Sequence, residues 1–159
     1  MSLRSGVLAL ALIGMTVAPA WADATAFIGA NTTPENRQAR GFALGIELLV
    51  VGFEFEYGNT SEDESHLSPS LKSGMGNVFV QMPFAVFGIV PYATAGAGMY
   101  RESLGGDSDT GFGLNTGGGI KVNMLGPIRL RVDYRVFKLG SGALYSPAHR
   151  VYVGLNLRF

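Results

Sequence analysis

Apolar and polar residues alternate with a period of two along most of the chain, which is the side-chain repeat of a β-strand. The clearest case is 128–138, where isoleucine, leucine, valine and tyrosine alternate with arginine and aspartate. Alternation of varying clarity defines eight segments: 24–30, 41–49, 50–58, 74–83, 90–100, 111–123, 128–138 and 149–159. Several approach the roughly 9–11 residues that a tilted strand needs to cross a bilayer. The pattern predicts an all-β protein of eight antiparallel strands.

The connections between these segments are expected to alternate in length. Four are long, polar and rich in turn residues: 31–40, 59–73, a third around 105–110, and 139–148. Three are short, around 49–50, 84–89 and 125–127. An up-and-down transmembrane β-barrel has this arrangement, with short periplasmic turns and longer external loops. Eight strands also place both termini of the chain on the same side, here the periplasmic one.

The N-terminus has the features of a secretory signal peptide. Arg4 provides a positive charge, residues 7–18 are mostly apolar, and Ala20-Trp21-Ala22 places small residues where a signal peptidase reads them. The apolar run is shorter than the roughly 20 residues that a transmembrane helix needs. We therefore expect residues 1–22 to be removed on export, leaving 23–159 as one barrel domain.

Composition narrows the possible functions. Of the charged residues only Arg4 lies within 1–22, so 23–159 carries a formal charge of −1. This near-neutral balance gives no argument for nucleic acid as a partner. The chain has no cysteine, which excludes disulfides, a thiol nucleophile and cysteine-bound metal. No cofactor or metal site is expected.

Alternation alone does not say which face of the barrel meets water. A secreted, lipocalin-like soluble barrel that binds an apolar ligand would have the same period with its charged face outside. The alternating loop lengths and a chain that ends on a strand favour the membrane barrel. Aromatic residues near strand ends could form interfacial girdles: Phe42, Tyr57, Tyr92, Tyr100, Phe112 and Phe159. Glycines on the polar face suit a narrow, crowded interior: Gly113, Gly117, Gly119 and Gly154.

The last two segments carry a family resemblance. Residues 151–159 (VYVGLNLRF) resemble the C-terminal strand of bacterial outer-membrane barrels, and 131–138 (RVDYRVFK) is similar to the penultimate strand of OmpA/OmpX-like small barrels. The resemblance implies an outer-membrane location and a terminal strand that the barrel-assembly machinery reads. The residues of that assembly signal would be Val151, Val153, Leu155, Leu157 and Phe159. No peptidoglycan-binding domain follows the barrel, so the anchoring role of full-length OmpA is not implied.

With the apolar face toward lipid, the polar face fills a lumen that is only just wide enough for side chains. The expected lumenal residues are Glu47, Glu54, Glu56, Gln81, Lys121, Arg129, Arg131, Asp133, Arg135, Asn156 and Arg158. Buried charges must be paired. We therefore predict ion pairs joining Glu54 and Glu56 to the arginines at 129, 131 and 135, completed by Lys121 and Asp133. Such a network would rigidify the core, or alternatively gate the passage of small ions.

Catalytic chemistry has little support in the sequence. The chain has two histidines, His66 and His149, and neither belongs to a His-x-Ser arrangement on the last strands. The acidic run 62–64, with Asp107 and Asp109, could attract divalent cations that bridge lipopolysaccharide, or could simply be hydrated loop. We expect a protein that is not an enzyme.

Three functions stay open at this point. The leading hypothesis is a monomeric structural or surface-interaction barrel, plugged by ion pairs, whose partners are outer-membrane lipid, lipopolysaccharide and an unidentified surface ligand. The second is a narrow ion pore of low conductance. The third is the secreted soluble barrel described above.

Overall fold

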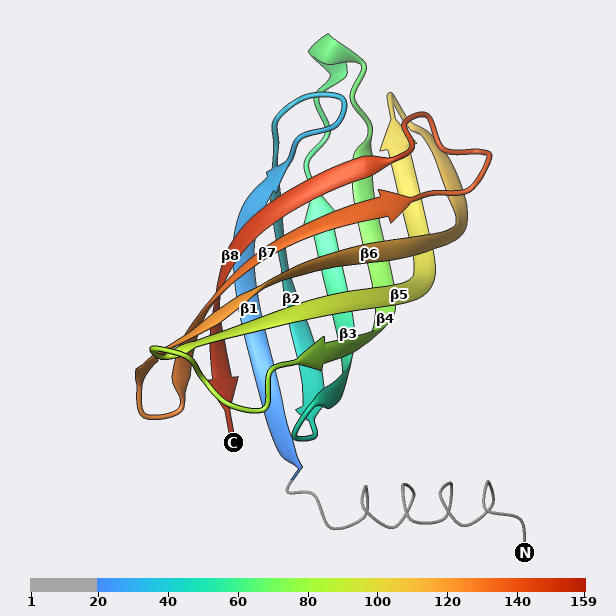
Figure 1. Cartoon of the computed structure of the whole chain (residues 1–159). Helices are drawn as coiled ribbons and strands as arrows, with labels where there is room; N and C mark the ends of the chain where they lie inside the picture. Colours follow the sequence, from blue (N-terminus) through green and yellow to red (C-terminus); the bar gives the residue numbers. More distant parts are fainter. Residues whose placement is uncertain (1–19) are drawn as a thin grey trace, which may run out of the picture.

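The computed structural model of the protein describes residues 20–159, which form a closed barrel of eight strands (Figure 1). The strands are β1 (Trp21–Asn31), β2 (Arg37–Glu47), β3 (Val51–Thr60), β4 (Ser70–Gln81), β5 (Ile89–Leu104), β6 (Asp107–Leu125), β7 (Ile128–Lys138) and β8 (Ala148–Arg158). Each strand pairs antiparallel with the next, and β8 pairs with β1 to close the sheet. The predicted eight-stranded up-and-down fold is confirmed.

The beginning of β1 and the end of β8 lie together at one end of the barrel (Figure 1). Ala22 and Phe159 join them there through two backbone hydrogen bonds of 2.8 and 2.9 Å. We call this the periplasmic end and the opposite one the external end. Residues 1–19 of the predicted signal peptide lie outside the described residues, and the predicted cleavage point after Ala22 falls within β1.

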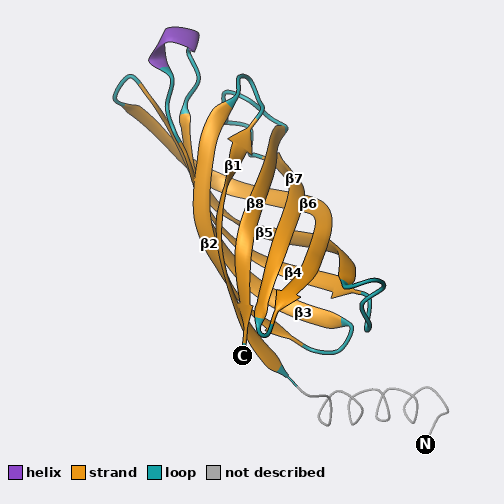
Figure 2. Cartoon of the chain, turned by 90° about the vertical axis from the view of Figure 1, so that its left-hand side faces the viewer, coloured by secondary structure: helices purple, strands orange, loops and turns teal. Residues whose placement is uncertain are grey.

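The external connections differ from the prediction. They span 32–36, 61–69, 105–106 and 139–147, and the second contains a short 3₁₀ turn, Glu64–His66 (Figure 2). The predicted third long loop is wrong, because β5 and β6 continue as a hairpin closed by Gly105 and Gly106. Both glycines have positive φ, 61° and 97°, which a two-residue hairpin turn requires and glycine allows. The periplasmic connection 82–88 is also longer than a tight turn, so the alternation of loop lengths is weaker than expected.

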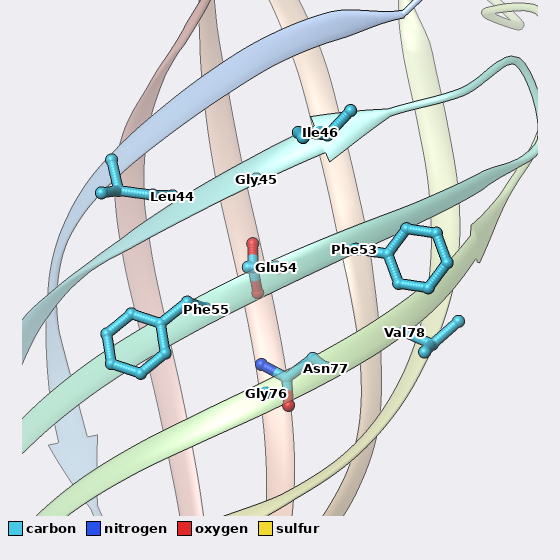
Figure 3. A pocket seen from close by; sticks show the side chains of 9 residues that line it. All are labelled: Leu44, Gly45, Ile46, Phe53, Glu54, Phe55, Gly76, Asn77 and Val78. Atoms are coloured by element: carbon cyan, nitrogen blue, oxygen red, sulfur yellow. The ribbon is translucent and has the colours of Figure 1, made fainter.

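The period of two sorts side chains to the two faces of the barrel wall. Outward positions carry large apolar residues such as Phe53 and Leu155, whose exposed fractions are 55% and 58%. Inward positions carry buried charges such as Glu54, which is 3% exposed. Figure 3 shows this alternation on β3, where the rings of Phe53 and Phe55 spread apart and Glu54 is seen end-on between them. The predicted assignment of faces thus agrees with the fold. Among residues 20–159, no helix is long and apolar enough to span a bilayer.

Glycine at position 52 makes room for a lumenal ring. A Cβ atom placed on Gly52 would lie 2.1 Å from Cζ of Phe79, a fully buried side chain on β4. On Gly74 a Cβ atom would face outward, at an ordinary 3.8 Å from the ring of Phe55. Packing inside the barrel therefore depends on the first glycine and not on the second.

We expect Gly52→Ala to destabilise the barrel, because the Phe79 ring must move within a filled lumen. Overpacking of this kind costs about 1–3 kcal/mol. Gly74→Ala is the matched control and should be neutral within about 0.5 kcal/mol. Urea titrations of both variants in lipid vesicles measure the difference, and equal midpoints would refute the packing argument.

Candidate functional site in the barrel lumen

The inward positions of all eight strands meet in the lumen, where a first group of charges lies near the periplasmic end. Glu47 of β2 pairs with Lys121 of β6, with Arg129 of β7 at 2.8 Å, and with Arg158 of β8 at 3.6 Å. Asp23 of β1 lies 3.5 Å from Lys121 and 3.4 Å from Arg129. Two carboxylates thus hold cations from three other strands, β6, β7 and β8.

A second group occupies the middle of the lumen. Glu54 pairs with Arg131 and, at 2.9 Å, with Arg135. Asp133, which lies between these arginines on β7, pairs with both at 3.3 and 3.0 Å. The Tyr92 hydroxyl donates to Asp133 and accepts from Nε of Arg131 at 2.7 Å. Every charge in this group therefore has an opposite charge beside it.

The middle group continues toward the external end through Glu56. This carboxylate pairs with Arg135 at 3.1 Å and with Arg150 of β8. The Arg150 guanidinium lies over the rings of Phe27 and Phe137, 5.1 and 4.6 Å from their centroids. Arg150 thus joins the ionic part of the lumen to an apolar part, and cation–π contacts favour its charge there.

The external half of the lumen holds a cluster of apolar side chains. Six buried residues form it: Leu71, Met75, Tyr100, Phe137, Leu139 and Ala148. They come from β4, β5, β7, β8 and the 139–147 connection. Buried polar residues such as Asn31, Arg37 and Ser73 share this half of the barrel with the cluster.

Polar contacts tie the external connections over this cluster. Arg37 donates to the carbonyl oxygens of Pro69 and, at 2.7 Å, of Thr33. Glu102 accepts a hydrogen bond of 2.9 Å from the backbone N–H of Leu144. The external mouth is therefore covered by connections anchored to the barrel wall.

The alternation in the sequence predicted most of the charged residues of the lumen, but not every pairing between them. All nine charged residues of the predicted network lie on inward positions and take part in ion pairs, including Lys121, Asp133 and Arg158. Arg129 was expected to pair with Glu54 or Glu56 and instead pairs with Glu47 and Asp23, because the register places it nearer the periplasmic end. The two uncharged residues join the same region, as Gln81 accepts from Lys121 and Asn156 from Arg129.

Two charged partners were missed. Asp23 and Arg150 are 2% and 3% exposed and add one acid and one base to the network. The period of two would have found both, since Asp23 shares its parity with Thr25, and Arg150 with Asn156. The lumen thus stays nearly balanced in charge.

The predicted aromatic girdle is partly wrong. Tyr92 and Tyr100 point into the lumen and are 6% and 2% exposed. The other four residues of that set are exposed on the outside: Phe42, Tyr57, Phe112 and Phe159. The alanines and glycines of the segment 90–100 do not distinguish its two faces, which is why both tyrosines were assigned to the wrong one.

The terminal strand has the form expected of the assembly signal. Its outward positions carry Val151, Val153, Leu155 and Leu157, which are 41–58% exposed, and Phe159 follows at 73%. Recognition of this strand by an assembly machinery stays a prediction.

Neither histidine is placed for nucleophilic catalysis. Nδ1 of His66 contacts both Oδ2 of Asp63, at 2.8 Å, and Oγ of Ser65, at 3.2 Å, so serine and carboxylate share one ring nitrogen. Hydrogen bonds from Ser65 and His66 lower the pKa of Asp63 to about 2, and the bond to Asp63 raises the pKa of His66. The geometry is that of a solvated loop contact.

His149 lies on β8 and contacts the hydroxyl of Tyr134 through Nδ1 at 2.6 Å. The next position on the same face of β8 is Val151, where a His-x-Ser arrangement would place its serine. Within residues 20–159, no group of three or more His, Cys, Asp or Glu side chains could hold a metal ion.

Comparisons with known proteins found similar structures but no similar sequence among family profiles or curated proteins. No family profile and no curated protein matches the sequence. The N-terminal β-barrel domain of Pseudomonas aeruginosa OprF is similar, with TM-score 0.66 and 16% identity over 87% of this chain and 97% of that one. Ail, the attachment invasion locus protein of Yersinia pestis, has TM-score 0.55 and 17% identity over 90% and 100%. The outer membrane enzyme PagL has TM-score 0.50 and 18% identity over 85% and 98%. The chain thus has the fold of the small eight-stranded β-barrels of bacterial outer membranes.

Proposed function

We propose that the protein is a closed barrel of the bacterial outer membrane with a structural or surface-interaction role. The observation that carries this proposal is the filling of the lumen, with ion pairs toward the periplasmic end and in the middle and an apolar cluster toward the external end. The outward face is apolar along the strands, which suits hydrocarbon and not water. Export through a cleaved signal peptide, residues 1–22, is part of the proposal.

The lumen argues against the two alternative functions. An ion pore needs an open polar path, but paired charges such as Glu54 and Arg135 occupy the middle of this lumen, and an apolar cluster lies on their external side. A soluble carrier of an apolar ligand needs an apolar cavity, whereas Arg131 and Arg135 lie in the centre of this barrel. A closed barrel agrees with both observations.

The partners follow from the surfaces of such a barrel. The outward face would contact membrane lipid and lipopolysaccharide, and the apolar outward face of β8 would be read by the barrel-assembly machinery. The external connections, anchored through Arg37 and Glu102, offer a fixed surface to a ligand outside the cell. We propose a monomer, because a closed barrel has no free strand edge to pair with another copy.

The fold by itself does not decide catalysis, since PagL shares it and is an enzyme. We propose a role without catalysis here, supported by the contacts of the two histidines. His66 engages Ser65 and Asp63 through a single nitrogen, and His149 is occupied by Tyr134. Neither arrangement lets a carboxylate orient the ring while the other nitrogen activates a serine.

Planar-bilayer recordings test the closed lumen. We expect folded wild-type protein to insert without discrete conductance steps, because the buried ion pairs and the apolar cluster leave no water-filled path. Insertion is verified on the same sample by heat-modifiable gel mobility. Regular single-channel steps from verified protein would replace this proposal with the narrow pore.

A further inference from the structure

On the outward face of the barrel wall, the charged strand residues are all positive, and all lie near the external end. Its outward strand positions hold four cations and no aspartate or glutamate: Arg40, Lys72, Arg101 and Lys138. All four lie toward the external ends of their strands. Among residues 20–159 none of them has a carboxylate within 4.0 Å, whereas the lumenal lysine and arginines of the network are all paired.

Three of these cations belong to one row of the β-sheet register, which we call the basic row. Lys72 of β4 lies directly opposite Arg101 of β5, and Arg40 of β2 is joined to Lys72 through Asn59 of β3. Neighbouring strands are about 4.8 Å apart, so all three side chains emerge within a short stretch of the outer surface. Because the strands are tilted, the row runs obliquely around the barrel (Figure 1).

The pairing of Lys72 with Arg101 is unfavourable by itself. Like charges directly opposite each other on adjacent strands destabilise a sheet. Within the described part of the chain, residues 20–159, these two side chains make one hydrogen bond, from Nη2 of Arg101 to Oγ of Ser108 at 2.9 Å, which neutralises no charge. An anion shared by the two cations would remove the repulsion.

The surroundings of the basic row indicate where that anion comes from. One outward position nearer the periplasm, the register row consists of Phe42, Tyr57, Gly74, Met99 and Phe112. Its aromatic rings are exposed, as in the interfacial girdle of a membrane barrel. The next row contains Leu44, Phe55 and Gly76, which border the apolar surface groove of Figure 3. Toward the external end, the outward face of the barrel thus carries first a groove suited to acyl chains, then aromatic rings, and then cations.

We propose that Arg40, Lys72 and Arg101 bind a phosphate-bearing headgroup of an outer-leaflet lipid whose acyl chains lie in the groove below. The inference rests on the proposed function, since it requires the outward face to be in a membrane. Arginine and lysine are suited to this role, the first as a bidentate partner of phosphate oxygens and the second as a point charge. Lys138 stands apart on β7 opposite Leu114 and belongs to no such row.

The test compares Lys72→Gln/Arg101→Gln with the wild type and with Lys138→Gln, which removes an outward cation of the same region. Each protein is folded into phosphatidylcholine vesicles with and without lipid A that carries both phosphates. Lipid A retained on the barrel is then counted by native mass spectrometry after extraction into detergent. The double variant should bind lipid A about 30-fold more weakly and Lys138→Gln less than about fivefold, from roughly a fivefold loss per cation.

Separate outcomes bear on separate claims. Equal lipid A binding by the double variant and wild type, or equal binding of lipid A stripped of its phosphates, would overturn the basic-row site. If the wild type bound inorganic phosphate as tightly as lipid A, the basic row would be a site for free anions, and the lipid assignment would also be overturned. A wild-type protein that does not fold into phosphatidylcholine vesicles at all would contradict the membrane barrel instead. The double variant should fold there at least as stably as wild type, because a like-charge pair has been removed.

Discussion

Replacing Glu54 with glutamine is expected to lower the free energy of unfolding in lipid vesicles by about 3–5 kcal/mol. The substitution keeps the size of the side chain and removes one negative charge from the middle of the lumen. Arg131 and Arg135 would then share Asp133, with Glu56 as the one further carboxylate beside Arg135. A buried cation deprived of its partner is costly, which is why the loss should far exceed that of a surface ion pair.

Urea titration of vesicle-folded protein, followed by gel mobility, measures the loss. Glu64→Gln is the matched control, because Glu64 lies exposed in the 3₁₀ turn of the 61–69 connection and should change stability by less than about 0.5 kcal/mol. Adding Arg131→Met to Glu54→Gln should recover part of the loss, since no unpaired cation stays behind. Equal stability of Glu54→Gln and Glu64→Gln would contradict the ionic core.

Replacing Val132 with arginine is expected to cost about 2–4 kcal/mol, because the new charge lies on the lipid face near the middle of β7. The control introduces the same residue at Gln38, an exposed outward position at the external end of β2, where the cost should be about 0–1 kcal/mol. Folding yield into vesicles and urea midpoints measure both. Equal tolerance of the two arginines would mean that β7 does not face hydrocarbon at residue 132.

Arg131→Gln would be a poorer control for that experiment. Arg131 contacts Glu54, Asp133 and Tyr92 in the lumen, so removing its charge disturbs the ionic core directly. Gln38→Arg avoids this problem because it changes an exposed outward position only.

The faces of the strands could be predicted from the sequence because alternation is a local property. On β7 each arginine is followed by an apolar residue, and that pattern divides the residues between the two faces of the strand. Partners across the lumen depend on register and on the tilt of the strands, which no local pattern contains. That is why Glu54 was correctly placed with Arg131 but Arg129 was placed with the wrong carboxylates.

The apolar cluster in the external half of the lumen could not be predicted in the same way. Met75 and Phe137 are apolar residues on inward positions, where they interrupt the expected polar face. Their burial follows from closure of the barrel around the external cluster. The two-residue turn at Gly105 and Gly106 was missed for a related reason, since the polar residues beside it look like loop although they belong to an extended hairpin.

The most direct test of the whole account is the accessibility of single spin labels on the outward face of the barrel wall. The chain has no cysteine, so Val132→Cys and Thr110→Cys each give one labelling site. In lipid vesicles we expect the label at 132 to be relaxed by oxygen and shielded from a water-soluble nickel chelate, whereas the label at 110 should be accessible to the chelate. A label at 132 that the nickel chelate relaxes as strongly as the label at 110 would contradict the account.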